Sequence, residues 1–270
     1  MAEALPISTE HCTVERDGHV VIVTMNRPEA RNALSSAMLV GLADAWAYMS
    51  ETPDVRVGIL TGAAGHFCAG ADLKAMGTPP SDPRVQERMQ QIQNFHWKGL
   101  LREGQPTVPL ICAIEGYAVA GGTELLVGTD LRVVAEDATL GLYEAKRGLF
   151  PMGGCAIRLP RQIGYANAMD ILLTARSVTP QEALAMGLIN QVVPSGTALD
   201  AARALADQIA ACGPLAVQAI LRTYRETVHL PEDEALKISD EIGWPVIGSK
   251  DAKEGSLAFK EKRPPVYKGE

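Results

Sequence analysis

The sequence has few of the features that mark secreted and membrane proteins. Among its 270 residues are five cysteines with no CxxC pair, and aromatic residues make up 5% of the chain. An odd number of scattered cysteines favours reduced thiols over a disulfide framework. The first ten residues lack a basic stretch followed by an apolar run, so no secretory signal is visible. These absences predict a cytoplasmic protein.

Long apolar runs and an excess of positive charge are also missing. The most apolar window, residues 108–127, is interrupted by Glu115, Thr123 and Glu124 and is too polar for a membrane span. The 25 Lys and Arg residues are outnumbered by 32 Asp and Glu residues, which gives a formal net charge of -7. A nucleic-acid-binding domain normally carries a basic face, so this balance argues against that partner. An anionic ligand is still compatible, because a few basic residues can gather locally in an acidic chain.

What the chain does contain is the composition of an ordinary globular protein, 47% hydrophobic and 21% charged. Runs rich in β-branched residues on either side of Asp17-Gly18 predict a hairpin. Ser35-Ser36 offers N-cap candidates for an amphipathic helix that ends near Met49. The hairpin strands are expected at residues 12–16 and 20–25, and further strands at 55–61, 110–114, 131–135, 139–142 and 191–193. Further helices are expected at residues 84–101 and 121–127, after Thr179, and at 198–211, 214–228, 232–242 and 250–260.

The order of these elements predicts an α/β fold in two parts. Strands alternate with helices over residues 1–195, which favours a sheet core covered by helices. Residues 196–270 are expected to form a C-terminal helical segment. In such folds the chemistry tends to gather in the loops that follow strand ends.

Two glycine-rich loops occupy that position. Residues 66–74 follow the strand that ends at Thr61, and residues 115–125 follow the strand that ends at Ile114. Small residues let a ligand approach backbone N–H groups, and a helix that starts near Gly121 would present unpaired donors. Either loop alone could equally be a tight turn that packs a helix on a strand.

Taken together, the motifs identify a family. The sequence resembles the crotonase (enoyl-CoA hydratase/isomerase) superfamily over nearly its whole length. The matching segments, in chain order, are Asn26-Arg27-Pro28 with Asn32-Ala33-Leu34, then residues 67–73, then Gly116-Tyr117-Ala118 followed by Gly121-Gly122-Thr123-Glu124. The resemblance implies a spiral of repeated ββα units with the helical segment completing oligomer contacts, and a homotrimer or dimer of trimers.

The resemblance also implies catalytic roles. The backbone N–H groups of Ala69 and Gly121 match the two donors of the family's oxyanion hole. Glu124 and Glu144 match its two carboxylates, 20 residues apart as in the family's hydratases. In this interpretation Glu124 takes a proton from water and Glu144 delivers one to C2 of the substrate, while like-charge repulsion keeps one of the two protonated. The plain alternatives are a helix N-terminal carboxylate for Glu124 and a surface charge for Glu144.

The sequence departs from the family pattern around the acyl pocket. Tyr143 replaces a usual proline, Lys146 and Arg147 stand where relatives are mostly apolar, and Met152 replaces a frequent glycine. These changes put the shape of the acyl pocket in doubt more than the chemistry. The acyl chain is expected between the Met76 region and the helix predicted at residues 84–101, whose apolar face carries Met89, Ile92, Phe95 and His96.

For coenzyme A, the resemblance places contacts in three segments. The expected binding residues are Ala30, Arg31, Ala71, Asp72, Leu73, Lys74, Phe259 and Lys262. The last two lie in a segment that, in the family, often reaches the nucleotide across a subunit interface. Glu29 stands where many relatives carry lysine, so one contact is expected to be missing.

The sequence therefore predicts an enoyl-CoA hydratase that needs no metal and no redox cofactor. Its substrate would be an acyl-CoA thioester, hydrated at a trans-2 double bond to a 3-hydroxyacyl-CoA. Other crotonase reactions (isomerisation, thioester hydrolysis or decarboxylation) use the same oxyanion hole with a different acid–base set. A non-catalytic acyl-CoA-binding protein is the alternative from another class, and retention of both glutamates argues against it.

Overall fold

A computed structural model describes residues 3–5, 7–74 and 77–270. A seven-stranded sheet forms its centre, in the order β1-β2-β3-β4-β5-β7-β10. The strands are β1 (Glu3–Ala4), β2 (Cys12–Asp17), β3 (Val20–Met25), β4 (Val57–Gly62), β5 (Leu110–Ile114), β7 (Leu131–Ala135) and β10 (Gln191–Val193). β1, β2 and β3 pair antiparallel, and every later pair is parallel. The parallel strands therefore end at one edge of the sheet, where both glycine-rich loops begin.

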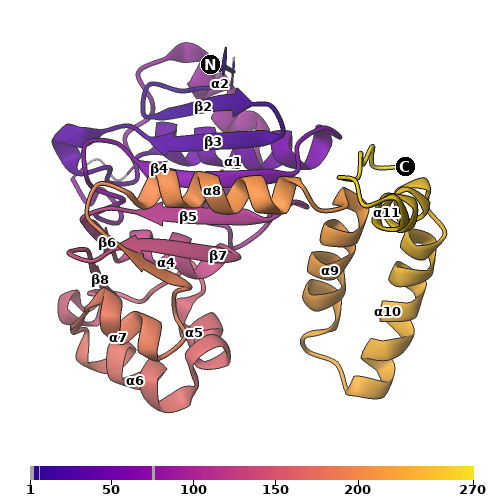
Figure 1. Cartoon of the computed structure of the whole chain (residues 1–270). Coiled ribbons are helices and arrows are strands. Elements are labelled where there is room, and N and C mark those ends of the chain that lie inside the picture. The colour runs from indigo at the N-terminus through magenta and orange to yellow at the C-terminus, as the bar shows by residue number, and fades with distance from the viewer. Residues whose placement is uncertain (1–2, 6, 75–76) are drawn as a thin grey trace.

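Helices cover both faces of this sheet, and alternating side chains decide which helix meets which face. On β3, Val20 and Ile22 pack with α8 (Ala198–Ala210), whereas Val21 and Val23 join the larger core that holds α1 (Ser36–Glu51). This period of two is what a strand buried on both sides requires. Figure 1 shows α8 lying across the sheet, so the first helix of the predicted C-terminal segment packs on the core.

A small second sheet lies next to the two glycine-rich loops. It pairs β6 (Tyr117–Val119) with β8 (Thr139–Gly141) and β9 (Ser177–Val178), in the order β6-β8-β9. A single bridge between Cys68 and Ala118 ties the first glycine-rich loop to β6. The helices at this end are α4 (Gly121–Gly128), α5 (Cys155–Ile163), α6 (Tyr165–Thr174) and α7 (Pro180–Ala185), with the short 3-10 helices η1 (Pro28–Ala30) and η2 (Ala145–Arg147).

The last helices leave the core. α9 (Pro214–Thr227) and α10 (Glu232–Ile247) form a hairpin that stands beside the sheet, with α11 (Lys250–Glu261) across its top (Figure 1). Many large apolar side chains on these helices are exposed: Ile220, Tyr224, Leu236, Trp244, Ile247, Leu257 and Phe259. An apolar surface of this kind usually marks a contact with another protein chain.

Most predicted elements are confirmed with ends shifted by a few residues. The hairpin pairs Asp17 with Val20, and Ser35 caps α1 by accepting a hydrogen bond from the Met38 N–H. The single helix expected over residues 84–101 is wrong. It is broken into α2 (Pro83–Gln91) and α3 (Phe95–Gly99), because Ile92 takes an extended backbone conformation after α2 and Asn94 takes left-handed angles before α3.

Within the described residues no single helix has the length and hydropathy of a membrane span. Only α8 and α9 taken together reach that composition, across a bend of 105°.

Candidate active site

The first glycine-rich loop follows β4 and directs its amides in several directions. The N–H of Ala69 donates to the carbonyl of Arg31 at 3.0 Å, and the N–H of Asp72 donates to the carbonyl of Leu34 at 3.1 Å. The N–H of Gly70 faces the sulfur of Cys68. Among the described residues, the N–H of Ala71 has no hydrogen-bond acceptor.

This pattern corrects the role predicted for Ala69. Its amide is already used inside the protein, so it is not free to bind a carbonyl oxygen of a ligand. Ala71, two residues later, offers the free amide instead. A Cβ built on Gly121 would lie 3.6 Å from the Ala71 nitrogen, so the two loops meet at this point.

The second loop supplies the other donor, at the start of α4. Ala120 precedes the helix with φ 50° and ψ −121°, an unfavourable conformation for a residue with a side chain. Gly121 is the first residue of the helix, so its N–H has no intrahelical acceptor. Close packing requires the glycines here, because a Cβ on Gly122 would lie 2.4 Å from the Cys68 carbonyl oxygen.

Glu124 lies in the first turn of α4 and is 5% exposed. Burial, and secondly the charge of Glu144, raise its pKa from 4.5 to about 7. The amides of Gly153, Gly154 and Cys155, at the start of α5, oppose this rise by hydrogen bonding to the carboxylate. Its Oε1 atom is buried and has no hydrogen-bond partner among the described residues.

Glu144 precedes η2 and is 9% exposed. Burial raises its pKa, while its own backbone amide and the charge of Arg147 oppose the rise. Its Oε2 atom is also buried without a partner among the described residues. Burial thus raises the pKa of both carboxyl groups, and like-charge repulsion between them favours a state in which the pair holds a single proton.

A cavity of about 690 Å³ joins these groups. Its lining includes Ala71, Gly121, Glu124 and Glu144, so the predicted carboxylates share one cavity with both free amides. Ala69 lines it too, although its amide is used elsewhere. The wall away from the two loops is largely apolar or aromatic: Phe95, His96, Trp97, Leu149, Phe150 and Met152.

The predicted acyl-pocket residues divide between this wall and the core. Phe95 and His96 line the cavity. Ile92 is buried in a cluster that packs against α1, and Met89 contacts that cluster. Met76, also expected beside the acyl chain, lies outside the described residues.

The residues predicted to bind coenzyme A are only partly brought together. Asp72 and Leu73 line the cavity, and the Asp72 carboxylate pairs with Arg27 at 2.5 Å and accepts the Lys74 N–H. The structure therefore gives the Asp72 side chain a part in holding its own loop.

The remaining predicted contacts lie outside the cavity lining. Ala30 belongs to η1, and Arg31 stacks its guanidinium over the Tyr117 ring at 5.2 Å. Phe259 and Lys262 are exposed on α11 and at its end, and neither lines the cavity of their own chain.

Two features of the site were missed by the sequence interpretation. The amides of residues 153–155 were not expected to contact Glu124, although Gly153-Gly154 before a helix was a visible signal for an anion-binding turn. The shared aromatic wall was also missed, because Trp97 and Phe150 come from segments far apart in sequence.

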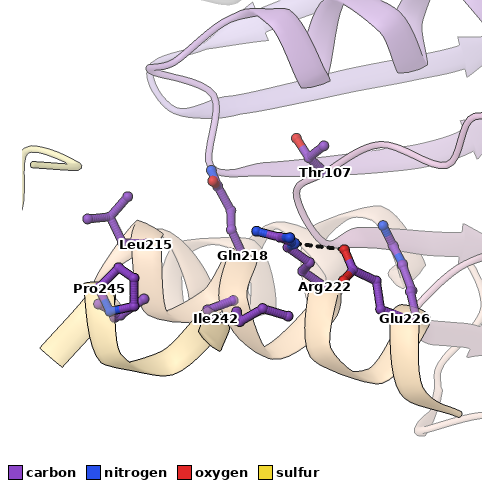
Figure 2. A pocket seen from close by; sticks show the side chains of 10 residues that line it. Thr107, Leu215, Gln218, Arg222, Glu226, Ile242 and Pro245 are labelled. Atoms are coloured by element: carbon purple, nitrogen blue, oxygen red, sulfur yellow. Dashed lines mark hydrogen bonds and ion pairs between the residues drawn. The ribbon is translucent and has the colours of Figure 1, made fainter. Parts of the chain in front are cut away.

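A second cavity, of about 550 Å³, lies between α9, α10 and Thr107. Figure 2 shows Arg222 paired with Glu226 at its edge, and Arg225 of the same lining pairs with Asp130. Its floor is apolar, formed by Leu215, Ala219, Ile242, Pro245 and Val246. It has no pair of buried carboxyl groups, so the first cavity is the candidate active site.

Comparisons with known proteins identify the family of this chain. A family model described as enoyl-CoA hydratase/isomerase matches residues 15–270. The chain is similar to enoyl-CoA hydratase EchA19 of Mycobacterium tuberculosis, with 54% identity over 94% of this chain and 95% of that protein. It is 36% identical to (E)-benzylidenesuccinyl-CoA hydratase of Thauera aromatica, over 95% and 98% of the two chains. A crystal structure of an enoyl-CoA hydratase from Mycobacterium tuberculosis superposes with TM-score 0.87 and 42% identity, covering 96% of this chain and 99% of that one.

Proposed function

This chain belongs to the enoyl-CoA hydratase/isomerase family, and on that basis we propose that it is an enoyl-CoA hydratase. It would add water across the trans-2 double bond of an enoyl-CoA and form a 3-hydroxyacyl-CoA. The proposal rests on two buried glutamates and two backbone amides that line one cavity. Among the described residues, one oxygen of each glutamate and both amides have no hydrogen-bond partner. Burying two carboxyl groups together is costly, so such a pair favours an acid–base function.

The two amides are proposed to hold the thioester oxygen. The N–H groups of Ala71 and Gly121 would donate to this oxygen as negative charge develops on it in the enolate. Such fixed donors stabilise the transition state more than the ground state, and one is typically worth about 3 kcal/mol of barrier. Because both are backbone groups, they keep their direction as long as the two loops keep their contact.

The glutamates are proposed to move the protons. Glu124 would accept a proton from water as the oxygen bonds to C3, and Glu144 would donate a proton to C2. This assignment requires the one proton of the pair to lie on Glu144 when the substrate reacts, so a path for its transfer between the two carboxyl groups is needed. A water molecule held between both carboxyl groups would provide the path.

The test is direct. Purified protein is mixed with trans-2-enoyl-CoA substrates of several lengths, and loss of the ultraviolet absorbance of the conjugated thioester is followed. Glu124→Gln and Glu144→Gln should each reduce turnover by about 10²–10⁴ while thioester affinity stays within about tenfold. Near-wild-type turnover in either variant would refute the role of that glutamate.

The same assays separate the alternatives. An isomerase would convert a 3-enoyl-CoA into the conjugated 2-enoyl isomer, and a hydrolase would release free thiol. A binding-only protein would hold the thioester but leave its absorbance unchanged. The buried glutamate pair favours hydration over each of these, because a water molecule needs both a base and an acid beside it.

We also propose that the protein works as a homotrimer or dimer of trimers built through its C-terminal helices. Trp244 and Phe259 are 67% and 87% exposed, which is costly for a chain that stays alone in water. Phe259 and Lys262 would then reach the coenzyme A nucleotide of a neighbouring subunit. Sedimentation of the purified protein tests this, and a stable monomer with full activity would exclude it. Four of the five cysteines are buried and all are free, which suits the cytoplasmic location we propose.

A further inference from the structure

Arg147 brings a positive charge to the cavity that the hydration chemistry does not use. It is the last residue of η2, the turn that begins directly after Glu144, and it lines the same cavity as both glutamates. Its Nη1 donates to the Tyr143 carbonyl at 3.4 Å. No carboxylate of the described residues lies within 4.0 Å of its guanidinium. Most of its hydrogen-bond donors are therefore available to a ligand.

The residues around Arg147 indicate which kind of substrate group its charge would suit. The neighbouring lining residues Leu149, Phe150 and Met152 suit a hydrocarbon chain, which gains nothing from a guanidinium. The Glu144 carboxylate, when ionised, would repel any anionic group that entered the cavity. An unpaired arginine beside that carboxylate offsets the repulsion, and its planar fork matches a carboxylate in a bidentate pair.

We propose that Arg147 binds a free carboxylate on the acyl group, so that the preferred substrates are coenzyme A monothioesters of unsaturated dicarboxylic acids. This inference rests on the proposed hydratase function and specifies its substrate class. The thioester end is held by Ala71 and Gly121, the double bond lies beside the glutamates, and the distal carboxylate reaches the guanidinium. Arg147 is thus a specificity residue, with no part in the proton transfers.

A matched substrate pair tests this. Trans-2-hexenoyl-CoA and trans-2-hexenedioyl-CoA have six-carbon acyl chains and differ only in whether the far end is a methyl group or a carboxylate. The corresponding eight-carbon pair, trans-2-octenoyl-CoA and trans-2-octenedioyl-CoA, tests a longer distance between the double bond and the guanidinium. The measured quantity is the ratio of kcat/KM for the dioyl substrate to that for its neutral partner. Wild-type protein should favour the dioyl member of at least one pair, and Arg147→Gln should lower that ratio by about 10- to 100-fold, the range of a charge-assisted hydrogen bond.

Lys146 provides the control. It is the adjacent cation, it is exposed over the Tyr143 ring at 5.8 Å, and it does not line the cavity. Lys146→Gln removes the same unit of charge and should leave the ratio within about twofold. Arg147→Lys should keep part of the preference, because a lysine retains the charge but loses the bidentate geometry.

Three outcomes would overturn the inference: a wild-type protein without dioyl preference at either length, an equal loss for both substrates in Arg147→Gln, or an equal change of the ratio in Lys146→Gln. An equal loss would assign Arg147 to tuning of Glu144 instead. Calorimetric binding of unreactive adipoyl-CoA and hexanoyl-CoA separates this inference from the hydratase proposal. If neither enoyl substrate is hydrated, the hydratase proposal fails, while the affinity ratio of the two saturated thioesters still decides the role of Arg147.

Discussion

Gly153 offers a way to move Glu124 without changing either glutamate. A Cβ built on Gly153 would lie 2.8 Å from both Cδ and Oε2 of Glu124, and 3.0 Å from its Cβ. The backbone at Gly153 does not have a positive φ, so alanine is compatible with its conformation. In Gly153→Ala the carboxyl group must therefore retreat by about half an ångström or more, which also loosens its contact with the amides of residues 153–155.

The expected result is a loss of turnover with little change in binding. Misplacement of a catalytic group by about 1 Å can cost 10²-fold, so kcat should fall by about 10- to 100-fold. KM should change by less than about threefold, because the Ala71 and Gly121 amides are untouched. The assay is steady-state hydration of an enoyl-CoA that the wild-type protein accepts.

A matched glycine elsewhere controls for the substitution itself. Gly243 lies within α10, and a Cβ there meets no atom within 4 Å. Gly243→Ala should keep wild-type kcat and stabilise the helix by about 0.5–1 kcal/mol. If Gly153→Ala folds normally and retains full kcat, the position of Glu124 against the start of α5 does not matter for catalysis, and the site as described is wrong.

Three further substitutions follow from the same geometry. Glu124→Gln should stabilise the fold at pH 8 by up to about 3 kcal/mol and lose this advantage as pH falls to 4.5, because a buried acid whose pKa is raised from 4.5 to about 7 destabilises the folded state as pH rises through that interval. Thermal unfolding of both proteins across pH measures this difference, and a difference that does not depend on pH would contradict it. By the same titration, kcat/KM of the wild-type protein should fall above pH about 7 as the pair loses its one proton. A kcat/KM that does not change between pH 6 and 9 would show that catalysis does not require this proton. Ala120→Gly should relieve unfavourable backbone angles and raise stability by about 1 kcal/mol, measured by denaturant unfolding, where a loss of stability would mean that Ala120 is not strained. Asp72→Asn should lower the free energy of unfolding by about 1–2 kcal/mol, because it breaks the partly buried ion pair with Arg27. Denaturant unfolding measures this loss, and an unchanged unfolding midpoint would contradict it.

Local patterns predicted most elements because their signals lie in neighbouring residues. The hairpin follows from Asp17-Gly18 between β-branched runs, and α7 begins with a capping box in which Thr179 and Glu182 bond each other's backbone. Such local patterns do not predict the break between α2 and α3 at residues 92–94. α2 ends at Gln91 because Ile92 is extended, and Asn94 takes a left-handed conformation before α3, although no glycine or proline marks the break.

The missed elements and contacts depend on tertiary structure. β6 and β9 have three and two residues, too few to show an alternating pattern, and they exist because β8 lies between them. The pairing of Glu124 with residues 153–155 likewise joins segments about 30 positions apart. Motif spacing could place the glutamates near each other only through the family resemblance, and it could not place the amides of residues 153–155 beside Glu124.

The choice between Ala69 and Ala71 shows how one glycine decides the site. In a regular strand, residues two apart direct their N–H groups to the same side, so the two alanines would be equivalent. Gly70 has φ +91° and breaks this regularity. The Ala69 amide therefore turns toward Arg31, whereas Leu34 pairs with both neighbours of Ala71, the Gly70 carbonyl and the Asp72 amide. That pairing leaves the Ala71 amide directed away from Leu34 and toward the loop of Gly121. A side chain on Gly70 would also meet the Ala120 Cβ at 2.7 Å, so the residue that turns one donor into position is the same one that lets the second loop approach it.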